Sequence, residues 1–145
     1  MGLYSALEIS VSGLTAERVA MELIASNLAN INTTRTIYGG PYRRRVPVFT
    51  EKNLSFADEL SAAEGKSYGR GGGVEVMDVA EDSTPFPKVY KPDHPDADAQ
   101  GFLSLPNVSM STEMADMVYV TRVYQANITA FNSTKKMISD TLQIQ

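Results

Sequence analysis

Residues 111–144 decide the fold, and they read STEMADMVYVTRVYQANITAFNSTKKMISDTLQI. Apolar residues recur along this stretch at alternating spacings of three and four, which is typical of one face of an α-helix and not of a β-strand. The stripe consists of Met114, Met117, Thr121, Tyr124, Ile128, Phe131, Ile138 and Leu142, and only Lys135 interrupts it. A straight helix of this length would reach about 50 Å. The sequence therefore predicts one long helix that projects beyond a domain of this size.

Residues 3–31 repeat this design near the start of the chain. Leu7, Leu14, Met21 and Leu28 recur every seven residues, which again indicates an amphipathic helix. Gly13 costs about 1 kcal/mol relative to alanine inside a helix, so it weakens one turn and allows a bend there. The Asn and Thr residues of 30–34 end the helix, because their side chains compete for backbone hydrogen bonds.

The middle of the chain differs in kind from its two ends. All seven prolines and most of the glycines lie there, and they mark turns between short strands. We expect strands at residues 42–49, 74–79 and 88–90, with a weaker candidate at 102–105. Residues 51–73 include a run of glycines that can pack almost nothing, so this stretch is expected to be mobile.

These elements predict a mainly α fold with a small β-rich insertion. The N-terminal and C-terminal helices pair as an antiparallel coiled coil, and this helical domain comprises residues 1–34 and 108–145. Residues 35–107 form a small, irregular β-rich middle domain that contains the mobile stretch 51–73.

Composition excludes several classes of function. The net charge is -4 and the pI about 5.0, so the chain has no general basic surface for nucleic acid or anionic lipid. Cysteine is absent, so neither a disulfide nor a thiolate nucleophile can form. Charged residues such as Glu8, Glu17 and Glu22 interrupt the first helix, so we expect neither a cleaved signal peptide nor insertion into a membrane.

Both end helices carry few charges for their length. Residues 3–31 hold four charged side chains in 29 positions, and residues 111–144 hold six in 34. A helical hairpin facing water normally carries Glu and Lys on its outer faces, whereas small neutral residues occupy them here. We therefore expect other subunits to cover these faces. A monomeric coiled-coil hairpin with an uncharged surface is the alternative.

Metal binding and catalysis have weaker support in the sequence. A calcium-binding module is the alternative function, because the opening positions of a calcium loop are matched by Asp96, Asp98, Gln100 and Gly101. Asn107 stands where that loop requires a bidentate Glu, so a turn rigidified by proline and capped by Asp is favoured. Hydrolysis would need His94, the only histidine, in an acidic loop without a serine motif, so we expect no enzyme activity, cofactor or metal.

The first expected strand contains three consecutive arginines, Arg43, Arg44 and Arg45. Their side chains alternate between faces on a strand, so they cannot form one basic patch. We expect them to contact carboxylates of a neighbouring subunit.

Four ordered motifs resemble the flagellar rod, hook and related axial proteins. Residues 26–34, SNLANINTT, resemble the N-terminal signature of these proteins. Residues 113–117, EMADM, with the later Arg122, Tyr124, Asn127 and Phe131, resemble the C-terminal one. Residues 39–44, GGPYRR, and 93–98, DHPDAD, resemble motifs of proximal rod members of the group.

The resemblance implies a structural subunit that polymerises through its end helices and transmits torque. Its middle domain would lie outside an inner tube of helices, and the chain would be exported unfolded through the flagellar type III apparatus to a periplasm-spanning rod. Expected partners are copies of itself and the rod proteins FlgB, FlgF, FlgG and FliE, with the membrane-embedded MS ring and the export gate nearby.

The resemblance also assigns roles to residues of the two helices. Asn27, Asn30, Asn32 and Asn127 would fix the register between helices, as an interface Asn does in coiled coils. A frayed helix end is the alternative for Asn32, and a simple core position is the alternative for Tyr124. The subunit-interface set is Leu7, Leu14, Met21, Asn27, Leu28, Asn30, Asn32, Met114, Met117, Arg122, Tyr124, Asn127, Ile128 and Phe131.

Overall fold

The structure is a computed structural model that describes residues 3–52, 60 and 72–143. Two long helices lie at the ends of the chain, α1 at Leu3–Ala29 and α3 at Met110–Gln143. The described residues between them form four strands: β1 at Arg45–Glu51, β2 at Val74–Glu81, β3 at Lys88–Tyr90 and β4 at Phe102–Ser104. Most of the stretch 51–73, which we expected to be mobile, lies outside the described residues.

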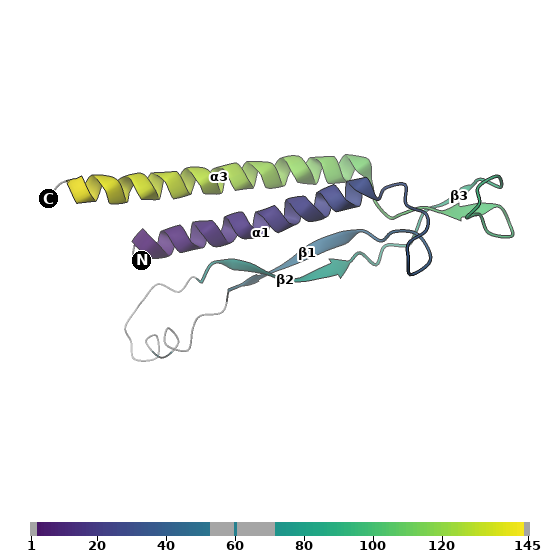
Figure 1. The fold of residues 1–145 in the computed structure, drawn as a ribbon, viewed down its shortest axis with the longest axis horizontal. Helices are drawn as coiled ribbons and strands as arrows, with labels where there is room; N and C mark the ends of the chain where they lie inside the picture. Colours follow the sequence, from purple (N-terminus) through teal and green to yellow (C-terminus); the bar gives the residue numbers. More distant parts are fainter. Residues whose placement is uncertain (1–2, 53–59, 61–71, 144–145) are drawn as a thin grey trace.

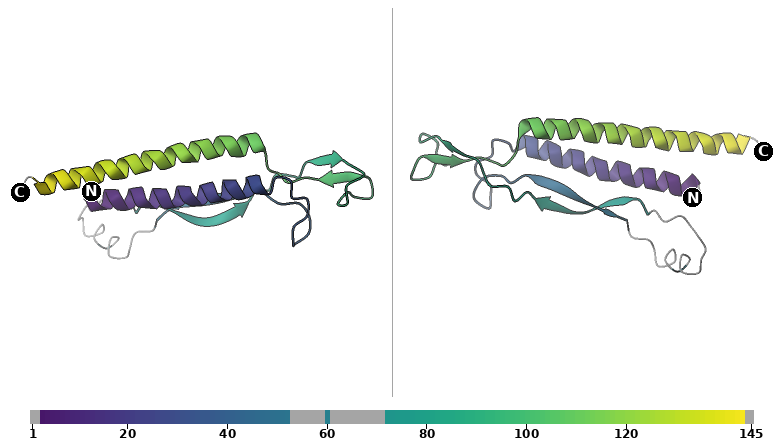
Figure 2. Two further views of the ribbon diagram at one scale, coloured as in Figure 1. Left: turned by 45° about the horizontal axis from the view of Figure 1, so that its top comes forward. Right: turned by 180° about the vertical axis from the view of Figure 1, so that it is seen from behind.

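The helices and the β1–β2 hairpin lie side by side in three layers that run along the long axis of the molecule. The layers follow the order α3, α1 and the β1–β2 hairpin (Figure 1). The two helices run antiparallel, so the N- and C-terminal ends of the chain lie near the same end of the molecule (Figure 2). The small β3–β4 hairpin extends past the opposite end of the helix pair. The predicted fold class, two paired end helices with a small β-rich insertion, is confirmed.

The β1–β2 hairpin is an antiparallel pair that lies along α1. Its register pairs Arg45 with Glu81 and Glu51 with Val74, and it shifts between Val48 and Phe49. Strand β1 begins at Arg45, three residues later than the sequence predicts, because the backbone N–H of the preceding residue donates to the side chain of Asn107 (2.8 Å). The weaker candidate strand is present as β4, which pairs with β3.

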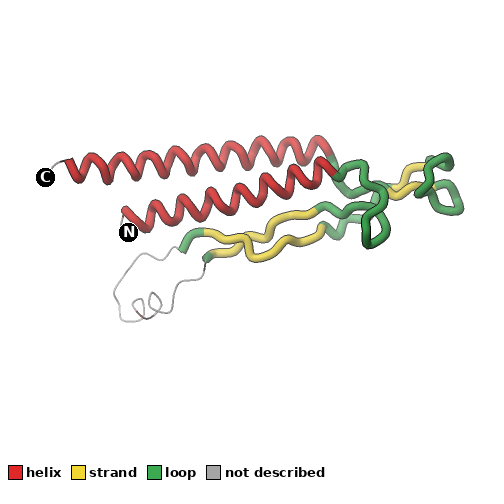
Figure 3. The backbone as a smooth tube through the Cα atoms, in the orientation of Figure 1, coloured by secondary structure: helices red, strands yellow, loops and turns green. Residues whose placement is uncertain are grey.

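Gly13 serves close packing and does not bend the helix. Helix α1 is continuous through this position (Figure 3). A Cβ atom at Gly13 would lie 2.9 Å from Nδ2 of Asn127 on α3, so the glycine lets the two helices approach closely. At Gly73, which has a φ of 88°, a Cβ would lie 2.1 Å from Oγ of Ser12. The adjacent N–H of Val74 donates to the same Ser12 hydroxyl, which fixes β2 against α1.

The hydrophobic core is thin and lies between the two helices. Ala20 and Ile24 of α1 pack against Val120 of α3, and Met21, Leu28 and Met117 flank them. Small side chains on α1 let the helix axes approach closely but bury little apolar area. Burial stabilises the fold by roughly 25 cal/mol per Å² of apolar surface, so the apolar contribution of this seam is small. Polar contacts therefore contribute much of the specificity of this helix pair.

Candidate assembly surfaces

The face of α3 that meets α1 carries polar residues at heptad spacing. Glu113, Val120 and Thr134 are buried, and Asn127 lies against Gly13. These four positions recur every seven residues, as the inward positions of a paired helix do. The side of α1 that faces α3 carries the buried Ala20 and Ile24. The seam between the helices is therefore partly polar and closely packed.

The apolar stripe predicted for α3 coincides with this seam only in part. Met117, Tyr124 and Phe131 are half-buried at the seam, whereas Met114 is 56% exposed and Ile128 is 36% exposed. The side of α3 that faces α1 is therefore not centred on the apolar stripe, because Glu113, Asn127 and Thr134 also face α1. An apolar pattern cannot identify these polar residues as inward positions.

This arrangement leaves an apolar face of α3 turned away from α1. The α3 outer face, as we call it, consists of the exposed residues Met110, Met114, Val118, Ile128 and Leu142. Among the described elements, α3 packs against α1 alone, and the β1–β2 hairpin lies on the far side of α1 (Figure 1). This face therefore has no covering element within the part of the chain that the structure describes. Such exposed apolar surfaces mark sites of protein association.

A buried polar network locks α1, α3 and the start of β1 together. Asn27 is 1% exposed, and its Nδ2 donates to the carbonyl oxygen of Arg45 (2.9 Å) and to Oε2 of Glu113 (3.1 Å). Its Oδ1 accepts from the hydroxyl of Tyr42 (2.9 Å) and from the backbone N–H of Arg45 (3.0 Å). Asn27 therefore links the two helices within one chain and directs all its side-chain hydrogen bonds inward.

Arg44 completes this network and corrects the expectation for the arginine run. Its Nε donates to Oε1 of the fully buried Glu113, and its Nη2 donates to Oδ2 of Asp116 (2.9 Å). Asp82 lies 3.8 Å from its Nη1. Burial alone would lower the pKa of Arg44, but the hydrogen bond and charge of Glu113, with the charges of Asp116 and Asp82, raise it. The carboxylates that Arg44 meets belong to its own chain, so the expected contact with a neighbour is wrong for this residue.

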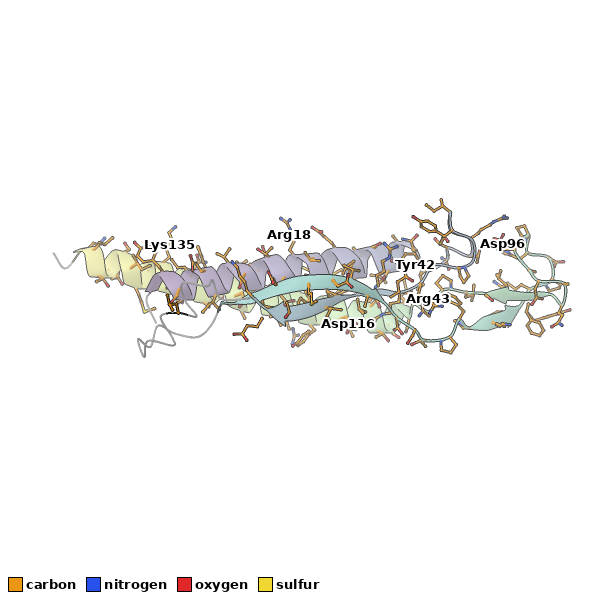
Figure 4. All side chains as sticks on the ribbon, turned by 90° about the horizontal axis from the view of Figure 1, so that it is seen from below. Arg18, Tyr42, Arg43, Asp96, Asp116 and Lys135 are labelled. Carbon is orange, nitrogen blue, oxygen red and sulfur yellow. The ribbon has the colours of Figure 1, made fainter. Side chains whose placement is uncertain are left out.

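Arg43 lies at the same junction, where the helices meet the β structure (Figure 4), and Arg45 is the first residue of β1. The guanidinium of Arg43 stacks 4.4 Å from the ring centroid of Phe86 and donates to the carbonyl oxygen of Asp82 (2.9 Å). Arg45 lies over Tyr42 at 5.9 Å and remains exposed. Of the three arginines, only Arg45 has an exposed side chain without an ion pair among the described residues.

The remaining predicted interface residues differ widely in exposure. Asn30 is half-buried and acts locally, since its Nδ2 donates to the carbonyl oxygen of Ser26 (2.9 Å) and its Oδ1 accepts from Thr33. Asn32 and Arg122 are exposed. Leu7, Leu14, Met21 and Leu28 are half-buried on α1. Their contacts with other subunits stay a prediction.

The acidic loop forms a self-capped turn. Oδ1 of Asp98 accepts from the backbone N–H groups of Gln100 and Phe102, both at 2.9 Å, and Oδ2 of Asp96 accepts from the hydroxyl of Thr34 (2.8 Å). Nδ1 of His94 accepts from the backbone N–H of Asp96 (3.1 Å). Among the described residues, no three acidic or histidine side chains gather as metal ligands. These contacts favour the structural interpretation of the loop over calcium binding.

Glu17 is a half-buried acid on α1 that makes no ion pair with a described residue, and burial raises its pKa. Because the folded pKa exceeds the unfolded one, ionisation destabilises the fold as pH rises through this interval. Glu17→Gln should therefore raise thermal stability at pH 7, within the roughly 0.5 kcal/mol usual for partly exposed positions. The gain should shrink below pH 4.5, the ordinary pKa of this carboxyl. Thermal denaturation at both pH values measures it.

The matched control for Glu17 is Glu22→Gln. Glu22 is more exposed and pairs with Arg18 at 3.4 Å, so its loss should not stabilise the chain. Equal effects of the two substitutions at pH 7 would contradict the role of burial.

Sequence reasoning missed the Tyr42, Arg44 and Glu113 cluster as a unit. It used Glu113 only as part of the EMADM motif, and it assigned Arg44 to a contact with another subunit. The seven-residue spacing of Glu113, Val120, Asn127 and Thr134 was the available signal, since it lies opposite a run of small residues on α1.

Neither described helix has a stretch long and apolar enough to cross a membrane.

The chain matches known proteins at both ends and over its whole length. Residues 7–35 match the family described as flagella basal body rod protein, and residues 99–144 match the C-terminal family of flagellar basal body rod FlgEFG proteins. It is 43% identical to the flagellar basal-body rod protein FlgC of Bacillus subtilis, over 99% of both chains. It is 38% identical to FlgC of Borreliella burgdorferi and 37% identical to FlgC of Escherichia coli, over 99% of this chain and 98% of each relative. These similarities cover both helices and the β-rich middle together, and the chain therefore belongs to the FlgC family of flagellar basal-body rod proteins.

Proposed function

We propose that this chain is a structural subunit of the flagellar basal-body rod and that it polymerises through the outer faces of its end helices. Family membership supports the role in the rod, and the α3 outer face carries the proposal for how the subunit assembles. That face presents five exposed apolar side chains, and among the described helices and strands α1 alone packs on α3. Burying such surface between subunits is favourable at roughly 25 cal/mol per Å².

In this proposal the helix pair forms the packed inner part of the rod, and the subunit acts mechanically and not catalytically. Neighbours would be copies of this chain and other rod proteins, with FlgB, FlgF, FlgG and FliE as the specific candidates and the MS ring and export gate nearby. The rod would span the periplasm, and the chain would reach it without a cleaved signal peptide. The polar seam supports such a load-bearing role, because close packing and fully used hydrogen bonds make the subunit stiff.

The proposed interface set consists of the residues predicted from the sequence that retain exposed surface. Met114 and Ile128 carry the largest apolar area of that set, since both lie on the α3 outer face. Arg122 and Asn32 are exposed and can make polar contacts. Asn27 fixes the register inside the subunit and presents no surface to a neighbour.

The test adds charge to the α3 outer face without touching the seam. A chain carrying both Met114→Asp and Ile128→Asp should fold but fail to assemble, because association would desolvate two unpaired carboxylates. We expect loss of motility on swim plates in a strain that relies on this chain, with an unchanged helical circular dichroism spectrum of the purified protein.

The matched control places the same two charges on another exposed part of α3. Ala126 and Ser133 are exposed and lie outside the α3 outer face, so Ala126→Asp with Ser133→Asp should reduce motility less. Full motility of the Met114→Asp, Ile128→Asp strain would refute the proposal. Equal loss in both strains would remove the special role of the apolar face.

A further inference from the structure

The two most exposed large hydrophobic side chains among the described residues stand side by side on one tight turn. Ile37 is 92% exposed and Tyr38 is 90% exposed. Isolated apolar residues on a surface need no explanation, but an adjacent pair with almost no contact to its own chain forms a projecting contact surface. We refer to Ile37 and Tyr38 as the apolar knob.

The turn that carries the knob has a defined conformation. The N–H of Thr36 donates to the carbonyl oxygen of Gly40 (2.8 Å), and the N–H of Gly39 donates back to the carbonyl oxygen of Thr36 (3.0 Å). Gly39 and Gly40 have φ values of 84° and 77°, a region that glycine enters without steric cost. A preorganised turn loses little entropy on binding, so the knob is suited to docking.

An apolar groove lies farther along the molecule, between the first half of α1 and the β1–β2 hairpin. It encloses about 670 Å³ and its apolar lining comes mainly from Leu7, Val11, Val19, Val74 and Val76. The knob follows the other end of α1, beyond Ala29 (Figure 1). Because the helix separates them, one chain cannot place its knob in its own groove.

Charge complements shape at these two surfaces. Arg35 and Arg45 are exposed and flank the turn of the knob, although Arg35 also lies 3.8 Å from the carboxylate of Asp96. Glu8 and Glu75 are exposed on the lining of the groove and form no ion pair among the described residues, although Lys52 lies on the same rim. Opposite charges around an apolar contact steer association and fix its orientation.

We infer that the knob of one subunit docks into the groove of a second copy of this chain. The inference rests on the proposed role as a polymer subunit, and it supplies a contact in addition to the α3 outer face. The two surfaces differ and lie apart along the long axis, so the contact is heterologous. Heterologous contacts that do not close a ring build helical assemblies, which is the geometry that a rod requires.

The absence of cysteine in the natural chain makes this contact directly measurable. Tyr38→Cys and Val11→Cys chains are expressed together in a flagellated strain that lacks its own copy, and isolated basal bodies are oxidised and separated without reductant. We expect a disulfide-linked dimer of this chain in the mixture and not from either variant alone. Ile37→Cys with Val11→Cys provides a second pair that keeps the tyrosine.

The control pair replaces the groove cysteine with Ser139→Cys, an exposed position of α3 away from the groove. Its dimer yield should be at least several-fold lower. Basal bodies that give no dimer from either knob pair would overturn the inference, as would a crosslink to a rod protein of different mass. If the charged α3 variants abolish motility while no knob dimer forms, the docking contact fails and the proposed function stands. If those variants swim normally, the proposed function itself fails.

Discussion

Replacing Glu113 with alanine is expected to lower the free energy of unfolding by about 3 kcal/mol, the lower end of the cost of breaking a buried ion pair. Glu113 is 0% exposed and accepts from Arg44 and from Asn27. Its loss leaves the guanidinium with less compensating charge and leaves one donor of Asn27 unpaired. Asp116 and Asp82 still lie close to Arg44, so the cost should not reach the top of the range.

Urea unfolding of the full chain, followed by circular dichroism, measures this change. Glu113→Gln should fall between the wild type and Glu113→Ala, because an amide oxygen can still accept a hydrogen bond without carrying charge. Asp116→Ala is the control, since Asp116 is 45% exposed and its ion pair should contribute no more than about 1 kcal/mol. Similar losses for Glu113→Ala and Asp116→Ala would show that burial of Glu113 does not set its importance.

Removal of residues 111–145 is expected to abolish motility completely. The deletion removes nearly all of α3, exposes the buried Ala20 and Ile24 of α1, and eliminates the α3 outer face. Removal of residues 1–31 should have the same result, because it takes away the layer between α3 and the β1–β2 hairpin. Swim plates and electron microscopy of isolated basal bodies measure the effect.

The control for both deletions is the full-length chain supplied from a plasmid in the same strain, with cellular levels compared by immunoblotting. A strain that carries either truncated chain at normal levels and still swims would contradict assembly through the end helices. Restoration of motility by the full-length chain excludes a secondary defect in the strain.

The two helices and their pairing could be predicted because their apolar residues repeat at helical spacing and their ends carry recognisable breakers. The prediction ended helix α1 close to its observed limit, since the Asn and Thr residues after Ala29 cap the backbone there. Short strands could be placed within a few residues from their flanking Gly and Pro. The exact start of β1 could not be predicted, because the amide oxygen of Asn107 binds the N–H of Arg44, and this contact joins residues far apart in sequence.

The rotation of α3 about its own axis did not follow from its apolar periodicity. Apolar periodicity favoured Met114 and Ile128 as inward positions, whereas the structure turns Glu113 and Asn127 toward α1. Contacts from two other segments of the chain determine this orientation. Gly13 leaves room for the side chain of Asn127, and Arg44 with Asn27 satisfies the polar atoms of Glu113. A pattern that scores one helix at a time cannot register such pairings.

Because of the layered order of the molecule, substitutions in its two helices should have different consequences. Helix α1 is enclosed by α3 on one side and by the β1–β2 hairpin on the other, whereas α3 has a single intramolecular neighbour among the described elements. Substitutions that disrupt the packing of α1 should therefore lower the melting temperature of the purified protein. Much of the exposed surface of α3 can change with no effect on melting, so harmful variants at those exposed positions would pass every assay of the isolated protein and fail only in the cell.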